Sequence, residues 1–231
     1  MPAHDEAAVI ADMVRRTHAA LVENGIADFE VVVVDDGSRD GTGGAVSRIA
    51  VELPHVRMVA HDRNRGYGAA LRTGFDAARC DAIWLLDGDG QFDPADLRLL
   101  LPQFGAHIVV AGYRVRRRDP LARRLSNRAF FALVRLRWGR IARDVNCGFK
   151  LFPGAVGRGL TRDGAMISTE LLLRAVEAGY EIREVPVPHY PRCAGVPSGA
   201  NPRVVLRAFA ELWAMSRAKP ESRALPPIRP H

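Results

Sequence analysis

The sequence predicts an α/β fold with a doubly wound, mostly parallel sheet flanked by helices, and two observations support this prediction. Short apolar runs alternate with longer segments of helical periodicity along the first 112 residues. Two of the runs end abruptly in acids, at Asp35-Asp36 and at Asp87-Gly88-Asp89. Because open α/β sheets bind ligands at the carboxyl ends of their strands, these acids also mark a candidate site.

The individual elements follow from periodicity and from the turn residues between them. Residues 31–34 are four valines, a composition typical of a central strand that is buried on both faces. Further strands are expected at 56–60, 82–86, 108–112 and 181–185. Helices are expected at 7–24, 43–52, 69–78, 94–104, 129–138, 169–178 and 203–215.

The length of 231 residues fits one domain, which we expect over 1–219, followed by a disordered Pro- and Arg-rich tail over 220–231. The three cysteines, Cys80, Cys147 and Cys193, have neither metal nor redox spacing. They are typical of reduced thiols, which predicts a cytoplasmic protein.

Charge is distributed unevenly along the chain. Residues 1–100 hold 10 Arg and 17 acids, whereas residues 101–231 hold 23 Lys or Arg and 9 acids. We therefore expect an acidic half over 1–112, which carries the acid-tipped strands, and a basic half over 113–219 that faces an anionic partner. No nucleic-acid-binding module is recognisable in the basic half, so nucleic acid is not the expected partner.

The two acid pairs suggest different contacts. Asp87 and Asp89 are hard oxygen ligands of the kind that Mg²⁺ or Mn²⁺ shares with substrate phosphates. A calcium loop of the EF-hand type is excluded, because Phe92 and Arg98 stand where that loop needs Gly and Glu. Asp35 and Asp36 are suited to accept hydrogen bonds from a ribose hydroxyl or a base N–H. The alternative for both pairs is that the acids only cap turns and helices.

Short motifs along nearly the whole chain carry a family resemblance. They are PAHDE at 2–6, DDGSRDGT at 35–42, NRGYG at 64–68, DGDGQ at 87–91, GYR at 112–114, DVNCGFK at 144–150, STELL at 168–172, VPV at 185–187 and YPR at 190–192. In this order they resemble family 2 glycosyltransferases of the GT-A fold, close to the dolichol- or polyprenol-phosphate sugar (mannosyl) synthases.

The resemblance implies an inverting, metal-dependent transfer of a sugar from GDP-mannose or a UDP-sugar to a polyprenyl phosphate. It implies a nucleotide-sugar site formed by Pro2, His4, Glu6, Val33, Asp35, Asp36, Asp87, Gly88 and Asp89. Asp87, Asp89 and Gln91 are then the expected ligands of Mg²⁺ or Mn²⁺, and Asp89 also has a catalytic role. Arg114 and Arg192 are expected to approach the donor or acceptor phosphates, since arginine forks suit phosphate.

The acceptor decides whether a base is needed. A lipid phosphate is already anionic at neutral pH, whereas a hydroxyl acceptor on a glycan or natural product requires a carboxylate to take its proton. Glu170 is the candidate base, and the alternative is an acid favoured at a helix start. A non-catalytic, sugar-nucleotide-binding, membrane-associated protein is a third interpretation, disfavoured by the intact Asp35, Asp87 and Asp89.

Two features concern the acceptor side. The arginine-rich run at 114–128 precedes the apolar segment 129–138, which either lies in a membrane interface, as a peripheral membrane protein would have it, or is an ordinary core helix. The lipid-phosphate synthases usually show Gly-Glu-Ser-Lys after the arginine that matches Arg192. Here the run 195–203 lacks the lysine, with Arg203 as a shifted substitute, so donor and acceptor remain open.

The N-terminus departs from the family pattern. Family members place an apolar strand directly before the segment that matches 2–6, whereas here Met1 precedes Pro2 directly. We therefore expect the first strand to be missing from the sheet, and hypothesise a natural start about ten residues upstream.

Overall fold

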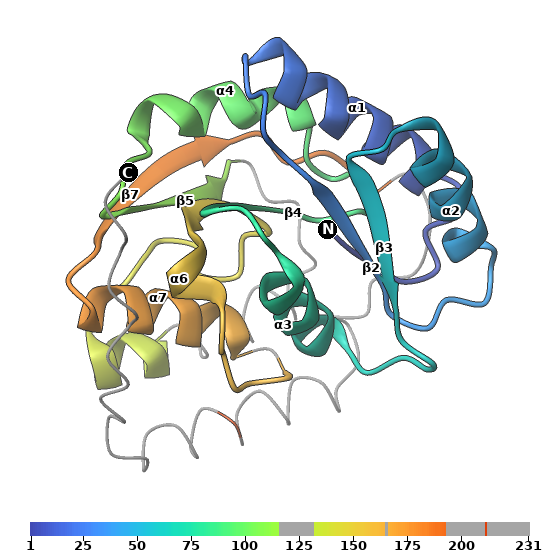
Figure 1. Cartoon of the computed structure of the whole chain (residues 1–231). Coiled ribbons are helices and arrows are strands. Elements are labelled where there is room, and N and C mark those ends of the chain that lie inside the picture. Colours follow the sequence, from blue (N-terminus) through green and yellow to red (C-terminus); the bar gives the residue numbers. More distant parts are fainter. Residues whose placement is uncertain (116–131, 165, 193–210, 212–231) are drawn as a thin grey trace.

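The computed structural model describes residues 1–115, 132–164, 166–192 and 211 (Figure 1). The strands are β1 Pro2–Ala3, β2 Val31–Asp35, β3 Val56–Ala60, β4 Ala82–Leu86, β5 Ile108–Arg114, β6 Phe149–Pro153 and β7 Glu181–Val187. The helices are α1 Ile10–Glu23, α2 Thr42–Glu52, α3 Tyr67–Ala77, α4 Leu97–Leu100, α6 Gly154–Gly157 and α7 Ile167–Glu177, with 3₁₀ turns at Pro94–Asp96 and Leu101–Gln103. Residues 132–138 are also helical.

The strands form two sheets with mostly parallel pairing, as expected. One sheet has the order β1-β2-β3 and is parallel throughout. The other has the order β4-β6-β5-β7, in which β5 and β7 are parallel and β6 runs antiparallel to β4 and β5. The sequence reasoning did not predict β6, although all of its residues, Lys150 included, are buried.

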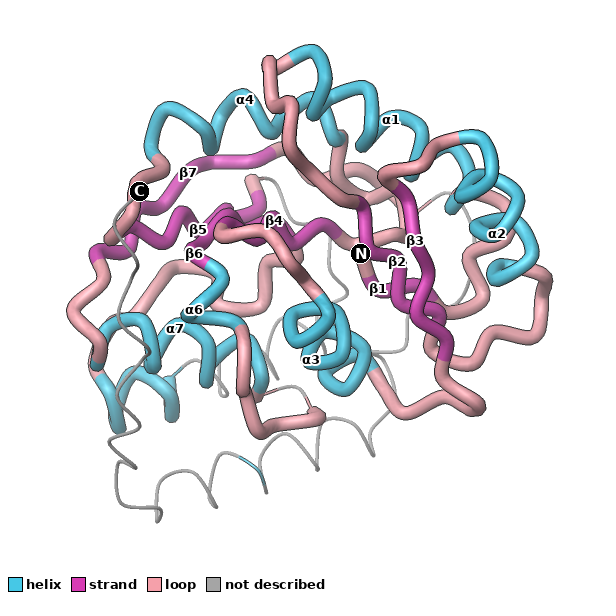
Figure 2. Tube along the Cα trace, in the orientation of Figure 1, coloured by secondary structure: helices cyan, strands magenta, loops and turns pink. Residues whose placement is uncertain are grey.

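Helices cover both faces of the sheets, which confirms the doubly wound arrangement (Figures 1 and 2). On one face, α1, α2 and α4 bury side chains such as Ile10, Val46 and Leu100 against β2 and β6. On the other face, α3, α6 and α7 form a second apolar cluster that includes Phe75 and Leu171. Each helix therefore contributes its apolar stripe to one of two separate layers of core.

Most predicted elements exist, with differences at their ends. The strands expected at 56–60 and 82–86 have those bounds. The helix expected at 94–104 is broken into a 3₁₀ turn, α4 and a second 3₁₀ turn, and Pro102, which has no N–H to donate, lies in the last of these. The predicted tail at 220–231 lies outside the described residues, as do the helix at 203–215, except for residue 211, and the first part of 129–138. Among the described helices, none combines the length and apolar character that a membrane crossing requires.

A strand does occupy the first position in the sheet, but it contains only two residues. Pro2 and Ala3 pair in parallel with Val34 and Asp35, which corrects the expectation that no strand would stand there. The Gly88 N–H donates to the Pro2 carbonyl oxygen at 3.3 Å, so β1 joins β2 to the loop that follows β4. This junction places the ends of β2 and β4, with their acids, on the same side of the molecule.

Candidate active site

The turn after β1 is tied to the turn after β2 by hydrogen bonds. The Glu6 N–H donates to Thr42 Oγ1 at 2.8 Å, and the Ala7 N–H donates to Asp40 Oδ2 at 2.9 Å. The Asp5 carboxylate accepts the Arg39 N–H at 2.9 Å, from a backbone with a φ of 55° that Asp tolerates better than most residues. These three hydrogen bonds hold the two acid-rich turns together as one wall of the site, formed by residues 4–7 and 35–42.

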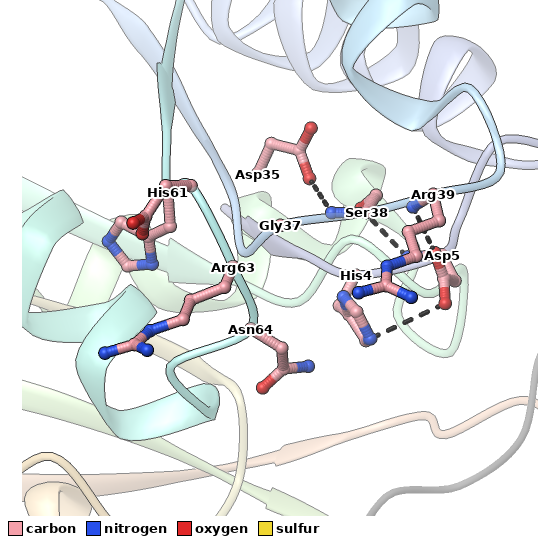
Figure 3. A pocket seen from close by; sticks show the side chains of 10 residues that line it. His4, Asp5, Asp35, Gly37, Ser38, Arg39, His61, Arg63 and Asn64 are labelled. Carbon is pink, nitrogen blue, oxygen red and sulfur yellow. Dashed lines mark hydrogen bonds and ion pairs between the residues drawn. The ribbon is translucent and has the colours of Figure 1, made fainter.

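A cavity of about 350 Å³ opens beside this wall and extends to the loop after β3 (Figure 3). His4 and Asp35 line it on the sheet side, and Arg39, Arg63 and Asn64 add donors around it. Asp35 Oδ1 accepts the Ser38 N–H at 3.0 Å. His4 Nδ1 is buried and has no hydrogen-bond partner among the described residues. The cavity thus offers acceptors and donors of the kind that recognise a nucleoside.

Two of the expected nucleotide residues lie elsewhere. The Val33 side chain is fully buried in the core of β2, so it does not line the cavity. Asp36 holds the loop after β3 in place. Its carboxylate accepts the N–H groups of Arg65 and Gly66, both at 2.8 Å, and lies 2.7 Å from His61 Nδ1. The two differences have separate causes. Asp36 is the residue next to Asp35 and points to the opposite side, whereas Val33 lies deeper along β2 and is enclosed by the core. Of these three residues, only Asp35 lines the cavity.

Asp87 and Asp89 lie together at the end of β4, as expected. The Tyr67 hydroxyl donates to Asp87 Oδ1 at 2.9 Å, and the Gln91 N–H donates to Asp89 Oδ1 at 3.0 Å. Burial, followed by the charge of Asp89, raises the pKa of Asp87 to about 7. Such a like-charge pair is unfavourable unless a cation neutralises it.

The two carboxylates fit a divalent cation in type and position. The described residues hold no cluster of three or more His, Cys, Asp or Glu side chains. Mg²⁺ is usually bound by one or two carboxylates together with substrate phosphates and waters. Gln91, the third expected ligand, has another contact: its side-chain amide donates to the Tyr190 carbonyl at 3.1 Å. This contact holds the segment after β7 against the loop 87–91.

The two expected phosphate-binding arginines differ in their surroundings. Arg192 pairs with the buried carboxylate of Glu6, and its Nη1 lies 4.0 Å from Asp89 Oδ2. Burial raises the pKa of Glu6, and Arg192 partly offsets that rise. Arg114, by contrast, forms a two-pronged ion pair with the buried Asp144, with Nε–Oδ2 at 2.7 Å and Nη2–Oδ1 at 2.9 Å. The structure thus places Arg192 beside the loop 87–91, whereas Arg114 pairs with Asp144.

Glu170, the expected base, accepts hydrogen bonds from the loop that precedes α7. Its Oε1 accepts hydrogen bonds from the N–H and hydroxyl of Thr161, at 2.9 and 2.7 Å, and its Oε2 accepts the Arg162 N–H at 2.9 Å. Glu170 lies in the first turn of α7 and fixes the loop that precedes that helix.

Comparison with known proteins assigns the family. Residues 1–162 match the family model described as Glycosyl transferase family 2. The chain belongs to glycosyl transferase family 2.

The chain is also similar to curated glycosyltransferases, two of which are named for different sugars. Glycosyltransferase AglD from Haloferax volcanii is 35% identical over 203 residues, which cover 83% of this chain and 32% of that protein. A dolichyl-phosphate beta-glucosyltransferase from Trichomonas vaginalis is 30% identical over 208 residues, or 81% and 61% of the two chains. An undecaprenyl-phosphate 4-deoxy-4-formamido-L-arabinose transferase from Pseudomonas aeruginosa is 35% identical over 159 residues, or 68% and 46%. The family 2 chain therefore spans between a third and three fifths of the length of these curated relatives.

Solved structures share the fold. Glucosyl-3-phosphoglycerate synthase from Mycobacterium tuberculosis, in complex with Mn²⁺, UDP-glucose and phosphoglyceric acid, has a TM-score of 0.70 at 21% identity, covering 95% of this chain and 79% of that one. Mannosyl-3-phosphoglycerate synthase from Rubrobacter xylanophilus has a TM-score of 0.67 at 17% identity, covering 97% and 76%. These similarities confirm the GT-A fold.

Sequence reasoning about the family 2 motifs missed three residues beside Asp87. Tyr67 belongs to the NRGYG motif, but nothing in its spacing shows that its hydroxyl reaches β4. A Cβ on Gly148 would lie 1.8 Å from Asp87 Oδ2, so only glycine fits there. Lys150 is fully buried, and its ammonium donates to the Cys147 carbonyl. The antiparallel pairing of β6 with β4 brings both residues to the site.

Proposed function

We propose that this chain is an inverting glycosyltransferase that moves a sugar from a nucleoside diphosphate sugar to a polyprenyl phosphate, with Mg²⁺ or Mn²⁺ held by Asp87 and Asp89. The observation that carries the proposal is that these two carboxylates and the nucleoside-sized cavity lie on the same side of the sheets, joined through β1. Two relatives, the dolichyl-phosphate and the undecaprenyl-phosphate sugar transferases, support a polyprenyl phosphate as the class of acceptor.

The donor nucleoside would occupy the cavity. Asp35, with one oxygen on the Ser38 N–H, keeps lone pairs for a ribose hydroxyl or a base N–H. His4 Nδ1 is buried without a partner among the described residues, and a ligand that hydrogen-bonds to it would remove that cost. Arg39 and Arg63 favour an anionic ligand at the rim. The proposal covers both GDP-mannose and UDP-sugars as donors.

In the transfer, an acceptor phosphate oxygen attacks the anomeric carbon as the bond from that carbon to the β-phosphate oxygen breaks. The nucleoside diphosphate leaves with one more negative charge. A divalent ion, when bound, would neutralise part of this charge. Arg192 is placed to contribute as well, because it already lies between Glu6 and Asp89.

The choice of a phosphate acceptor also removes the need for a catalytic base. The attacking oxygen is already anionic, so no proton has to be removed. A hydroxyl acceptor would require Glu170 to act as the base, but three donors already occupy its oxygens. These contacts favour the lipid phosphate over the hydroxyl, and the carboxylate pair with its cavity favours an enzyme over a non-catalytic binding protein.

The test compares two acceptors that differ only in the phosphate. The chain is incubated with Mn²⁺ and labelled UDP-glucose or GDP-mannose, together with either a polyprenyl phosphate or the same polyprenol without phosphate. We expect label in the lipid extract only when the acceptor is the polyprenyl phosphate. At saturating Mn²⁺, the Glu170→Gln variant should transfer sugar to this acceptor at the wild-type rate. Transfer to the free alcohol that is lost in Glu170→Gln would instead establish the hydroxyl mechanism.

A further inference from the structure

We propose that Tyr67 is a positioning residue that orients Asp87 in the candidate metal site, and that the loop 161–164 holds Tyr67 in place. The inference rests on the proposed function, because it concerns the same carboxylate. It assigns a role to the hydroxyl of Tyr67 and to the contacts of Glu170 that the transfer chemistry leaves unexplained.

The Asp87 carboxylate is confined between two groups from distant parts of the chain. The Tyr67 hydroxyl donates to Oδ1 at 2.9 Å. On the other side, Gly148 comes so close that a Cβ would lie 1.8 Å from Oδ2. Gly148 confines the side chain by contact, whereas Tyr67 is the one described residue whose side chain donates a hydrogen bond to it. A carboxylate that accepts one such bond keeps its remaining lone pairs for a cation.

Tyr67 is itself fixed by the backbone around it. It is the first residue of α3, directly after Gly66, whose φ of 97° favours glycine. The Gly66 N–H donates to the buried Asp36. The backbone of Tyr67 is therefore held by the turn that precedes α3, and this determines where the side-chain hydroxyl lies.

The loop before α7 packs against the same turn. A Cβ on Gly68 would lie 2.4 Å from the carbonyl oxygens of Asp163 and Gly164, so the two backbones are in direct contact. Arg72 of α3 pairs with Asp163 at 2.9 Å. Glu170 shapes this loop by accepting the N–H groups of Thr161 and Arg162. A chain of contacts thus runs from Glu170 through the loop and α3 to Asp87.

This arrangement matters for metal binding because a ligand must be held to within about 0.5 Å of its productive position. Groups that orient a metal ligand typically change metal affinity by about 10- to 100-fold when they are removed. Phenylalanine retains the ring and its packing, so Tyr67→Phe removes only the hydrogen bond. Tyr180→Phe is the matched control, because Tyr180 lies beyond α7 with its ring 5.8 Å from His107.

The experiment measures Mn²⁺ binding to the full chain in the presence of UDP or GDP, by electron paramagnetic resonance of the free ion. We expect Tyr67→Phe to weaken binding about tenfold and Tyr180→Phe to match the wild type, with melting temperatures showing that both variants fold. Equal affinity in Tyr67→Phe and wild type would overturn this inference alone. No Mn²⁺ binding by the wild type would overturn the metal site of the proposed function and this inference with it.

Glu170→Gln tests the second part without touching Tyr67. Its loop loses a charged acceptor, so we expect weaker Mn²⁺ binding in the same direction but by a smaller factor. Unchanged binding would show that the loop does not support Tyr67. A loss of donor turnover in Glu170→Gln with normal Mn²⁺ affinity would likewise count against the positioning role.

Discussion

At the scale of single residues, the site brings charged side chains together in a partly buried environment, where each charge depends strongly on its neighbours. Asp87 and Asp89 repel each other, and burial raises the pKa of Asp87 to about 7. Glu6 is buried with Arg192 as its counter-charge. The cost of removing these charges from water offsets most of the stability that their interactions contribute. Such groups are often found where a protein binds a charged ligand.

The Glu6–Arg192 pair predicts an asymmetric response to mutation. Arg192→Ala leaves a carboxylate that is 3% exposed without its cation, so we expect the free energy of unfolding to fall by about 3 kcal/mol. Adding Glu6→Gln removes the unpaired charge and should restore a large part of the loss. Urea unfolding of the single and double variants measures both changes. If the double variant is no more stable than Arg192→Ala, burial of the Glu6 charge is not the cause.

Glu30 predicts a pH dependence of stability. Its carboxylate accepts hydrogen bonds from Arg57 Nε at 2.7 Å and from the Arg79 N–H at 2.5 Å. Burial raises its pKa, but these bonds and the arginine charges outweigh burial and hold the pKa below the ordinary 4.5. Because the pKa is lower in the folded state, this stabilisation is complete above pH 4.5 and is lost as the pH falls through the folded pKa.

We therefore expect Glu30→Gln to lower the free energy of unfolding by about 1 kcal/mol at neutral pH, a modest value because solvent screens part of the interaction. The difference from wild type should vanish in acid, below the folded pKa. Urea unfolding at neutral pH and through the acid range gives the comparison. A difference that stays constant with pH would exclude the ionised carboxylate as its source.

At the scale of elements, the helical residues 132–138 stand out by their exposed apolar side chains. Leu136 is 84% exposed and Leu133 is 43% exposed, next to Arg135 and Arg137. Val134 of the same segment is buried. One face thus packs on the protein while another combines apolar and basic groups, as membrane-interface helices do. Of the arginine-rich run expected at 114–128, residues 116–128 lie outside the described residues.

We predict that the chain binds anionic vesicles through this segment at low salt and is released at high salt, since each basic residue near the surface contributes about 1 kcal/mol. Leu136→Glu should reduce co-flotation with phosphatidylserine vesicles. Val51→Glu is the matched control, because Val51 is an apolar residue of α2 that is 87% exposed. Failure to float at low salt, or equal effects of both variants, would contradict membrane contact by this helix.

At the scale of the whole molecule, periodicity predicted the layers well and the long-range contacts poorly. The valine run of β2 correctly predicted a strand with parallel neighbours. The strand β4, which was expected to be parallel as well, instead pairs antiparallel with β6. The strand β6 was missed because it begins within the motif at 144–150 and has a buried lysine as its second residue. Tyr67 and Asp87 are separated in the sequence by the length of α3 and by β4, and no local pattern encodes their contact.

The candidate site was therefore predicted in part. Asp35, Asp87 and Asp89 lie where the sequence indicated, whereas Val33, Asp36 and Arg114 have partners in the interior. Residue type alone does not distinguish an arginine on a phosphate from one on a buried carboxylate. That distinction depends on Asp144, which the fold brings to Arg114 from 30 positions away.

The most direct test of the account is sugar transfer to a polyprenyl phosphate by the wild type and by Asp89→Asn at saturating Mn²⁺. Asparagine keeps the shape of the side chain and removes its charge. We predict that transfer falls by a factor on the order of 10² or more while the melting temperature stays near that of the wild type. Transfer at the wild-type rate by Asp89→Asn would contradict the assignment of the two carboxylates to a catalytic metal.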